Sequence, residues 1–551
     1  MLHALSMSQM PGLALLTPPE AVEYTALLPA SIAALTALLV ILIDLFHQGD
    51  TSRGYQAYFS AIGLGIALVS CWVLWGDTID QSVFHGMLYL DKFTLMFAVI
   101  GLGTGILSML MSPDYLQSHL MDRGEYYMLV LFSVSGMIII AGAADLLTFF
   151  IGFEVMSIPV YVLAGFLRKD SRSAEASMKY FILGAFSAAL MLYGIALIYG
   201  VTGTTNLEFI GQFLTELLDD PEAASGAIPM VVFGVLLILS GFAFKIASVP
   251  FHVWTPDVYT GSPTPAVGFM ATAIKAGAFA AMVRVFFIAF DAELLRGGFF
   301  GMGWVDVFLF ISAASMVLGN LVAITQDNVK RMLAYSSIAH AGYILVGFVA
   351  ASARPEYFLF NDSVIFYLVT YAVGTVGAFG VLAWFGRRGE EAVEYDDLDG
   401  LGFKYPLIGL FMGIFMFSSA GIPPTGGFVG KLYVFRAAVD VGAQTGEMAF
   451  IGLAVLGVLT SVAGVYYYLR VLVHMYMRDQ KREVHPLVNS GAKFALTVCA
   501  VLTLYLGVLP DRVLTWSQEA IADFQGADGE IQQVIDEGKA DLEARLEERE
   551  D

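Results

Sequence analysis

Long runs of apolar residues, separated by short breaks rich in charged residues, proline or glycine, fill the chain from about residue 25 to residue 515. Most runs reach roughly eighteen residues, the length that a helix needs to cross a hydrocarbon core about 30 Å thick. Membrane β-strands would instead alternate apolar and polar residues over about ten positions, so these continuous runs favour helices. The pattern predicts about fourteen spans, the twelfth of them interrupted, centred near residues 36, 65, 102, 134, 156, 188, 238, 277, 312, 341, 374, 423, 462 and 504.

The amino-acid composition also favours a membrane protein. Of the 551 residues, 58% are hydrophobic and 14% are charged, whereas soluble domains carry roughly 25% charged residues. The chain is therefore predicted to be an all-α polytopic membrane protein. Cys71 and Cys499 both lie inside apolar runs, which indicates buried apolar side chains and neither a disulfide nor a metal site. The sequence carries no nucleotide-binding fingerprint, haem-attachment motif or iron–sulfur cysteine spacing, so electrons would have to travel through another polypeptide.

Positive charge is unevenly distributed between the connections, and this distribution predicts the orientation. The connections after odd-numbered spans hold thirteen Lys and Arg residues, and those after even-numbered spans, without the C-terminal tail, hold three. Connections rich in Lys and Arg stay in the cytoplasm, so both termini are predicted to be extracytoplasmic in a multi-pass protein of the cell inner (plasma) membrane. The thirteen are Arg53, Arg123, Arg168, Lys169, Arg172, Lys330, Arg331, Arg387, Arg388, Lys404, Arg478, Lys481 and Arg482; the three are Lys92, Arg296 and Arg354.

The predicted organisation begins and ends outside the membrane. Residues 1–24 lack Lys and Arg and do not resemble a cleaved signal peptide, so we expect an extracytoplasmic N-terminal segment there. The net charge is −21, of which residues 517–551 contribute −9 through twelve acids and three bases. This composition predicts a solvated, partly helical acidic tail over 516–551. Between the two ends, the boundaries predict spans 1–3 over 25–124, spans 4–8 over 125–290, spans 9–13 over 300–476 and span 14 over 493–515.

Several ionisable side chains fall at membrane depth. A charge at the bilayer centre costs about 2.5–3.5 kcal/mol on insertion scales, so such residues are expected to face the bundle interior and to interact. Burial brings the proton affinities of amines and carboxyls closer together, and a row of such groups linked by water is a proton relay in chemical terms. The candidates are Glu154, Lys245, Lys275 and Lys431, flanked by apolar residues on both sides, and then Lys179 and His340.

Structural explanations remain open for some of these residues. Lys179 lies near the cytoplasmic end of its span, where it can extend to the surface or pair with Glu175 on the same helix face. His340 can be a hydrogen-bonded core histidine. Lys330 and Arg331 lie at the predicted cytoplasmic end of span ten, where the preference for positive charge in the cytoplasm explains both.

Prolines accompany the deepest lysines. Pro250, Pro256, Pro263 and Pro265 follow Lys245, and Pro423 and Pro424 precede Lys431. Proline interrupts helical hydrogen bonding, and broken backbone at membrane depth persists only within protein or beside a hydrated cavity. We therefore expect broken helices 7 and 12 at these positions, with the lysines as titrating groups beside the breaks. The two segments lie five spans apart, which predicts an inverted five-helix repeat.

The runs "FKIASVPFHVWTPDVYTGSPTPAVGFMATAIKAGAF", "KRMLAYSSIAHAGYILVG" and "GIPPTGGFVGKLYVF" resemble the antiporter-like membrane subunits of respiratory complex I, a NADH-quinone oxidoreductase. The resemblance covers roughly residues 90–475. Among the three paralogues usually called L, M and N, the chain looks most like N, because it has a lysine at 431 and no apolar run after span fourteen.

This resemblance implies fourteen helices with two inverted five-helix repeats, spans 4–8 and 9–13. It further implies that Glu154 modulates Lys245, that Lys275 connects the two halves, and that Lys431 ends the second half. A secondary proton path would include Lys179, His340 and Lys330, with helix breaks at Pro250, Pro256, Pro423 and Pro424.

The resemblance also implies a function and partners. The chain would translocate protons while quinone is reduced elsewhere in the complex, and it would bind no cofactor itself. NADH, FMN, iron–sulfur clusters and quinone are expected on partner subunits. The expected partners are the other membrane-arm subunits and the lipid bilayer, and not nucleic acid. Two alternatives stay open, a subunit of a multi-subunit cation/proton antiporter of the Mrp type and a non-translocating membrane scaffold.

Overall fold

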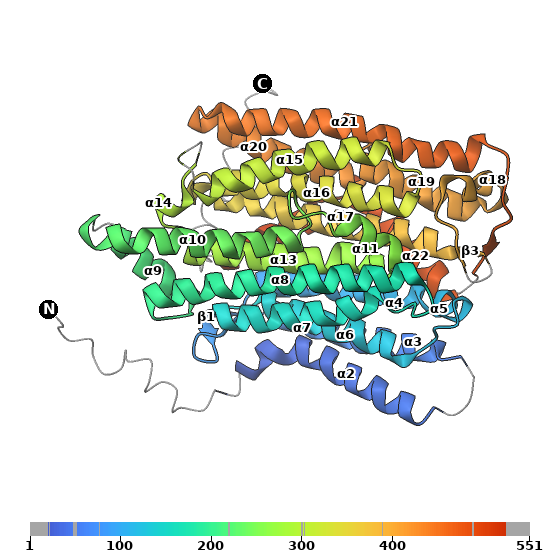
Figure 1. The fold of residues 1–551 in the computed structure, drawn as a ribbon, viewed down its shortest axis with the longest axis horizontal. Helices are drawn as coiled ribbons and strands as arrows, with labels where there is room; N and C mark the ends of the chain where they lie inside the picture. The colour runs from blue at the N-terminus through green and yellow to red at the C-terminus, as the bar shows by residue number, and fades with distance from the viewer. Residues whose placement is uncertain are drawn as a thin grey trace, which may run out of the picture.

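The computed structural model describes residues 20, 23–47, 52–76, 78–218, 221–298, 301, 303–387, 390–487 and 490–524. The predicted N-terminal segment 1–24 lies almost wholly outside these residues, and tail residues 525–551 lie outside them entirely. Thirteen helices in the described part are long and apolar enough to cross a membrane. The predicted all-helical polytopic class is confirmed, and Figure 1 shows the long helices aligned roughly along one axis.

The long helices follow the predicted apolar runs. In the first half they are α2 (Leu28–Leu45), α3 (Gly54–Leu74), α4 (Lys92–Met111), α6 (Gly124–Ala141), α7 (Leu146–Ala164), α8 (Ser171–Thr202) and α10 (Pro221–Lys245). The eighth predicted span is one continuous rod made of α12 (Thr264–Phe269), η3 (Met270–Ile274), α13 (Lys275–Arg284) and η4 (Val285–Ala289), in which η3 and η4 are π-helical. The later helices are α15 (Trp304–Ile324), α16 (Val329–Ala351), α17 (Asn361–Trp384), α19 (Pro406–Ala420), α20 (Gly426–Thr445), α21 (Met448–Met477) and α22 (Ser490–Val508).

Shorter elements lie between or beside these helices. They are η2 (Glu23–Leu27), α5 (Pro113–Ser118), α9 (Leu207–Leu218), α11 (Thr255–Gly261), α14 (Glu293–Arg296), η5 (Pro355–Phe360), η6 (Tyr395–Asp397), α18 (Leu401–Lys404) and α23 (Asp511–Phe524). Strands β1 (Ile79–Val83) and β2 (Leu88–Leu90) form an antiparallel pair. Strands β3 (Phe385–Arg387), β4 (Glu390–Glu391) and β5 (His485–Pro486) form a three-stranded antiparallel sheet in the order β4-β3-β5, at the end of the bundle that also carries α5 and α18 (Figure 1).

The core of the bundle lies around the rod over residues 264–289, which is buried along its whole length. Helices α16 and α17 are nearly as buried, whereas only about a third of α2 and of α21 is buried, and both carry exposed apolar side chains. Apolar surface turned outwards in this way fits a lipid environment. The central helices are therefore the ones that can hold polar groups away from lipid.

Helical structure is interrupted directly after Lys245 and shortly before Lys431. Helix α10 ends at Lys245, and the next helix, α11, begins at Thr255 with Pro256 in its first turn. Helix α19 ends at Ala420, capped by Gly421 in the left-handed conformation, and α20 begins at Gly426 after Pro423 and Pro424. Helix ends leave backbone carbonyls without helical partners. At the second interruption, two such carbonyls accept hydrogen bonds from Lys431.

The start of the predicted acidic tail is packed and helical. Helix α23 lies against α4 and α17, with Ala520 and Ile521 fully buried. Asp523 accepts from the backbone amide of Lys92 at 2.5 Å. The sequence did not reveal this packing because α23 is amphipathic and short, so its apolar face does not form a continuous run.

Candidate functional site

Lys245 ends α10 inside a cage of aromatic rings. Its Nζ lies 4.8 Å from the ring centre of Phe153, 5.2 Å from that of Tyr161 and 5.7 Å from that of Tyr180. The side chain is only 2% exposed. Aromatic faces attract a cation electrostatically and do so most strongly where water is excluded. The cage therefore supports a buried ammonium without fixing it by hydrogen bonds.

Glu154 lies on α7, half-buried, one position after Phe153 of that cage. Among the described residues, neither Glu154 Oε1 nor Lys245 Nζ has a hydrogen-bond partner, and no ion pair joins the two side chains. A buried polar group without a partner costs about 1–3 kcal/mol, more when it is charged. The structure therefore places the Glu154 carboxyl near the Lys245 amine without an ion pair between them.

Lys275 is held by hydrogen bonds. It begins α13, directly after the π-helical segment η3, and its Nζ donates to Ser337 O at 2.6 Å and Ser337 Oγ at 2.7 Å. Tyr371 donates its hydroxyl to the same Ser337 Oγ at 2.8 Å, and its ring centre lies 5.2 Å from Lys275 Nζ. Ser337 on α16 and Tyr371 on α17 thus link the first half of the chain to the second.

His340 continues this polar line one turn along α16. Its Nδ1 lies 2.9 Å from the hydroxyl of Tyr367 and its Nε2 lies 3.1 Å from that of Tyr468, which in turn contacts Ser336 Oγ at 2.5 Å. The ring is 4% exposed. A cavity of about 10 Å³, lined in part by His340, Tyr371 and Ser419, lies next to it. This volume is close to what one water molecule occupies.

Lys431 closes the row at the second interruption. Its Nζ donates to Ser419 O at 2.8 Å, to Ala420 O at 3.3 Å and to Ser461 Oγ at 2.7 Å. The two carbonyls are at the C-terminal end of α19, where the helix dipole favours a cation. Gly421 has a φ of +81°, and a Cβ there would lie 2.9 Å from Lys431 Cδ. Glycine at 421 is therefore required both for the turn and for the lysine stem.

Lys179 lies in a surface ion network. It is 40% exposed, and its Nζ lies 2.7 Å from a carboxylate oxygen of Glu175 and 2.7 Å from one of Asp257. Asp257 also accepts from Arg331 at 2.6 Å. The pairing with Glu175 that the sequence left open is therefore present. The structure joins Lys179 to this network and not to the aromatic cage of Lys245.

Lys330 is buried against an acidic partner, which the cytoplasmic preference for positive charge does not by itself explain. Its side chain is completely buried, and its Nζ lies 2.7 Å from Glu391 Oε2. Sequence reasoning missed Glu391 because the acid lies in a polar connection sixty-one positions away.

A second buried ion pair was also missed. Arg284, 1% exposed near the end of α13, donates to both carboxylate oxygens of Asp91 at 2.7 and 2.8 Å and to Thr94 Oγ1 at 2.8 Å. An arginine within the apolar run "AAMVRVFFIAF" was a visible signal, whereas the capping acid Asp91 before α4 was not. The pair lies apart from the lysine row.

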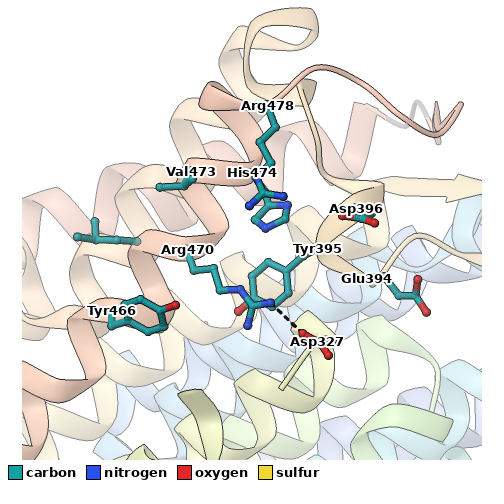
Figure 2. Close-up of a pocket in the computed structure, with 10 residues that line it drawn as sticks. Asp327, Glu394, Tyr395, Asp396, Tyr466, Arg470, Val473, His474 and Arg478 are labelled. Atoms are coloured by element: carbon teal, nitrogen blue, oxygen red, sulfur yellow. Dashed lines mark hydrogen bonds and ion pairs between the residues drawn. The ribbon is translucent and has the colours of Figure 1, made fainter. Parts of the chain in front are cut away.

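A cavity of about 520 Å³ opens near η6 and the end of α21, with His474 and Arg470 on its wall (Figure 2). Ligand atoms of Asp396, Asp399 and His474 lie within 4.8 Å of one another. Lys481 Nζ lies 3.1 Å from Asp396 and 3.2 Å from Asp399, so one ammonium group bridges the two carboxylates and offsets part of their charge. This cluster is therefore an ion-pair network at the end of the bundle.

The chain matches the family described as "NADH:quinone oxidoreductase/Mrp antiporter, TM" over residues 143–457. A protein named NADH-quinone oxidoreductase subunit N, from Trichlorobacter lovleyi, is 42% identical over 503 residues, which cover 91% of this chain and 98% of that protein. A chain of respiratory complex I from Thermus thermophilus with bound aureothin is 33% identical, with a TM-score of 0.71, over 88% of this chain and 98% of that one. A chain of the Mrp complex from Dietzia sp. has a TM-score of 0.73 at 21% identity, over 92% of this chain and 98% of that one, which shows a shared fold.

Proposed function

The chain belongs to the NADH:quinone oxidoreductase/Mrp antiporter transmembrane family, and we propose that it is the N-type proton-translocating subunit in the membrane arm of a NADH-quinone oxidoreductase. One observation carries the proposal. Lys245, Lys275, His340 and Lys431 are each 6% exposed or less, and they follow one another from one helix interruption to the other. Buried bases in a membrane protein are costly, and where they occur they mark ion or proton paths.

Proton release would start at the acid. When the Glu154 carboxylate closes on Lys245 Nζ, the pair favours the ammonium form, and when it opens, the proton is released towards Lys275. Ser337 Oγ already binds both Lys275 and the hydroxyl of Tyr371. The open arrangement of Glu154 and Lys245 corresponds to the releasing state of such a switch. No large helix movement is needed, because a side-chain displacement is sufficient.

The second half of the path would run from His340 to Lys431. Hydroxyls of Tyr367 and Tyr468 contact both nitrogens of the imidazole ring, so a proton taken at one nitrogen can leave from the other. The small cavity beside Ser419 lies between His340 and the carbonyl that binds Lys431. One water molecule there would join the two groups.

Redox chemistry would belong to partner subunits. Relatives of this chain are named as subunits of NADH-quinone oxidoreductase, so NADH, FMN, iron–sulfur clusters and quinone are assigned to the rest of that complex, and the other membrane-arm subunits are the lateral partners. We place the protein in the cell inner (plasma) membrane with both termini extracytoplasmic, on the strength of the charge distribution between its connections. An Mrp-type antiporter has only the shared fold and the joint family description in its favour.

The experiment is purification of the chain in mild detergent followed by proton-pumping measurements on the reconstituted complex. Quinone-reductase subunits are expected in the preparation, whereas small antiporter subunits would support the Mrp alternative. A triple variant, Glu154→Gln, Lys245→Met and Lys431→Met, is expected to assemble and to reduce quinone without normal proton translocation. Normal translocation by this variant would make the chain a scaffold.

A further inference from the structure

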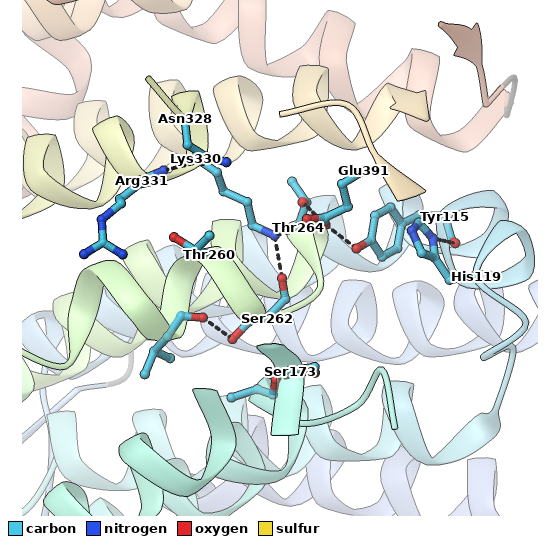
Figure 3. A network of polar contacts seen from close by, with 12 residues as sticks. Tyr115, His119, Ser173, Thr260, Ser262, Thr264, Asn328, Lys330, Arg331 and Glu391 are labelled. Atoms are coloured by element: carbon cyan, nitrogen blue, oxygen red, sulfur yellow. Dashed lines mark hydrogen bonds and ion pairs between the residues drawn. The ribbon is translucent and has the colours of Figure 1, made fainter. Parts of the chain in front are cut away.

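The fully buried Lys330 lies in the first turn of α16, where the bundle meets its end loops. Its Nζ donates to Glu391 Oε1 at 2.9 Å, to Glu391 Oε2 at 2.7 Å and to Ser262 O at 2.6 Å (Figure 3). Ser262 follows α11, and Pro263, the next residue, has no N–H, so the local backbone is short of donors. All three ammonium protons are thereby used.

Glu391 gathers donors from several elements. It lies on β4 and accepts from Thr264 Oγ1 of α12 at 2.5 Å and from the hydroxyl of Tyr115 of α5, in addition to Lys330. Burial by itself raises the pKa of the Glu391 carboxyl, but the charge of Lys330 and the donated hydrogen bonds outweigh burial and hold that pKa below its ordinary range. At rest the pair is therefore a carboxylate and an ammonium.

The two partners differ in their access to solvent. The Lys330 side chain is 0% exposed, whereas that of Glu391 is 17% exposed. Glu391 forms part of the wall of an open cavity of about 780 Å³, together with Lys169, Thr260 and Glu394. Glu391 therefore borders the open cavity on one side and a fully buried amine on the other.

On its inner side the pair faces the lysine row. Lys330 and Ser337 lie seven residues apart on α16, and this spacing places them on one helix face about 10 Å apart. Ser337 is the residue that holds Lys275. Ser337, at the middle of the lysine row, thus lies about two helical turns further along α16 than Lys330.

Stability alone does not account for this arrangement. Removing two charges from water costs several kcal/mol for each ion, and replacing a buried ion pair by well-packed neutral residues is often neutral or stabilising. A surface cavity, a slightly exposed acid, a fully buried base and the lysine row beyond it form instead a graded path for a proton.

We propose that the Glu391–Lys330 pair is the port through which protons pass from the 780 Å³ cavity into the lysine row, an inference that rests on the proposed function. The Lys330 ammonium first gives a proton inward, towards Lys275, and becomes a neutral amine. Glu391, now without its counter-charge, takes a proton from water in the cavity and passes it to the amine. One proton enters, one leaves, and the carboxylate and ammonium are restored.

The test uses the assembled, reconstituted complex and measures protons translocated per quinone reduced. Glu391→Gln is expected to lower this ratio to the level of Lys245→Ala, and Glu391→Asp is expected to restore part of it. The matched control is Glu394→Gln, since Glu394 lies on the same cavity wall but pairs with Arg482 at 2.6 Å and not with Lys330. This control should pump normally.

The outcomes separate the port from the general function. If Lys245→Ala lowers the ratio and Glu391→Gln does not, the port is refuted and the proton-translocating function stands. If both variants pump normally, both proposals are refuted. If Glu391→Gln fails to assemble, the double variant Lys330→Gln/Glu391→Gln replaces the charge pair by two amides. Assembly without pumping then supports the port, whereas normal pumping or failed assembly makes the pair purely structural.

Chemical blocking of the cavity gives a separate measurement. Thr260 lies on the cavity wall, and the native Cys71 and Cys499 are fully buried, so Thr260→Cys provides one accessible thiol. A bulky thiol reagent is expected to lower the pumping ratio of this variant and to leave the unsubstituted complex unaffected. Complete labelling without loss of pumping would exclude the cavity as the proton source.

Discussion

Replacing Glu154 by glutamine should abolish the effect of this acid on the protonation of Lys245. The size of the effect follows from the absence of an ion pair between the two side chains. No ion pair, which requires 4.0 Å or less, joins these two described residues. At an effective dielectric constant near 20, unit charges attract by about 4 kcal/mol at 4 Å and about 6 kcal/mol at 2.8 Å. Closing the contact therefore adds at least about 2 kcal/mol in favour of the ammonium, a change of about 30-fold in its protonation equilibrium.

The assay is dye-reported acidification by proteoliposomes that contain the complex, normalised to quinone reduced. Glu154→Gln loses this gain and should pump poorly, whereas Glu154→Asp keeps the charge and should be milder. Glu175→Gln is the control, because Glu175 is a 62% exposed acid that pairs with Lys179 at the surface. Equal losses for Glu154→Gln and Glu154→Asp would show that packing at this position matters and charge does not, which would refute the reasoning.

Two further predictions concern the bases at the interruptions. Lys245→Ala should lower proton pumping, while Lys404→Ala, an exposed substitution outside the cavity of Glu391, leaves it near normal. Equal behaviour in the same vesicle assay would remove Lys245 from the path. Gly421→Ala should destabilise the protein by about 1–2 kcal/mol, because alanine is strained in the left-handed conformation. The added Cβ should also displace the Lys431 side chain. Gly446→Ala is the control, because Gly446 has a similar φ of +77° but no neighbouring atom that a Cβ would meet. The melting temperature should fall for both glycine variants, whereas proton pumping should fall only for Gly421→Ala. A loss of pumping in both variants would assign the effect to backbone strain.

Much of the fold was predictable because hydropathy is a property of one segment at a time. Apolar runs located the spans, and the prolines before Lys431 marked the place where α19 ends and α20 begins. The spacing of Lys245 from its prolines likewise indicated the end of α10. The roles of these lysines in proton transfer stay predictions.

Partners across the bundle were not predictable. Lys330 reads as a typical cytoplasmic lysine in sequence, and only the tertiary structure shows that it is buried and paired with Glu391 on β4. Lys179 reads as a membrane lysine, yet its helix face turns it towards Asp257 at the surface. The sequence cannot distinguish these two cases, because the exposure of a side chain near a helix end depends on which neighbour covers it.

The order of residues along this chain determined its class, its helices and the depth of its basic groups, because a helix in lipid must satisfy its own backbone and show apolar side chains over a fixed length. Tertiary structure alone decided which bases meet carbonyls, hydroxyls or aromatic rings, and which acid faces a cavity. These contacts join residues that are far apart in the sequence, such as Arg284 and Thr94, which are 190 positions apart. Their geometry is set by helix packing, which no local pattern records.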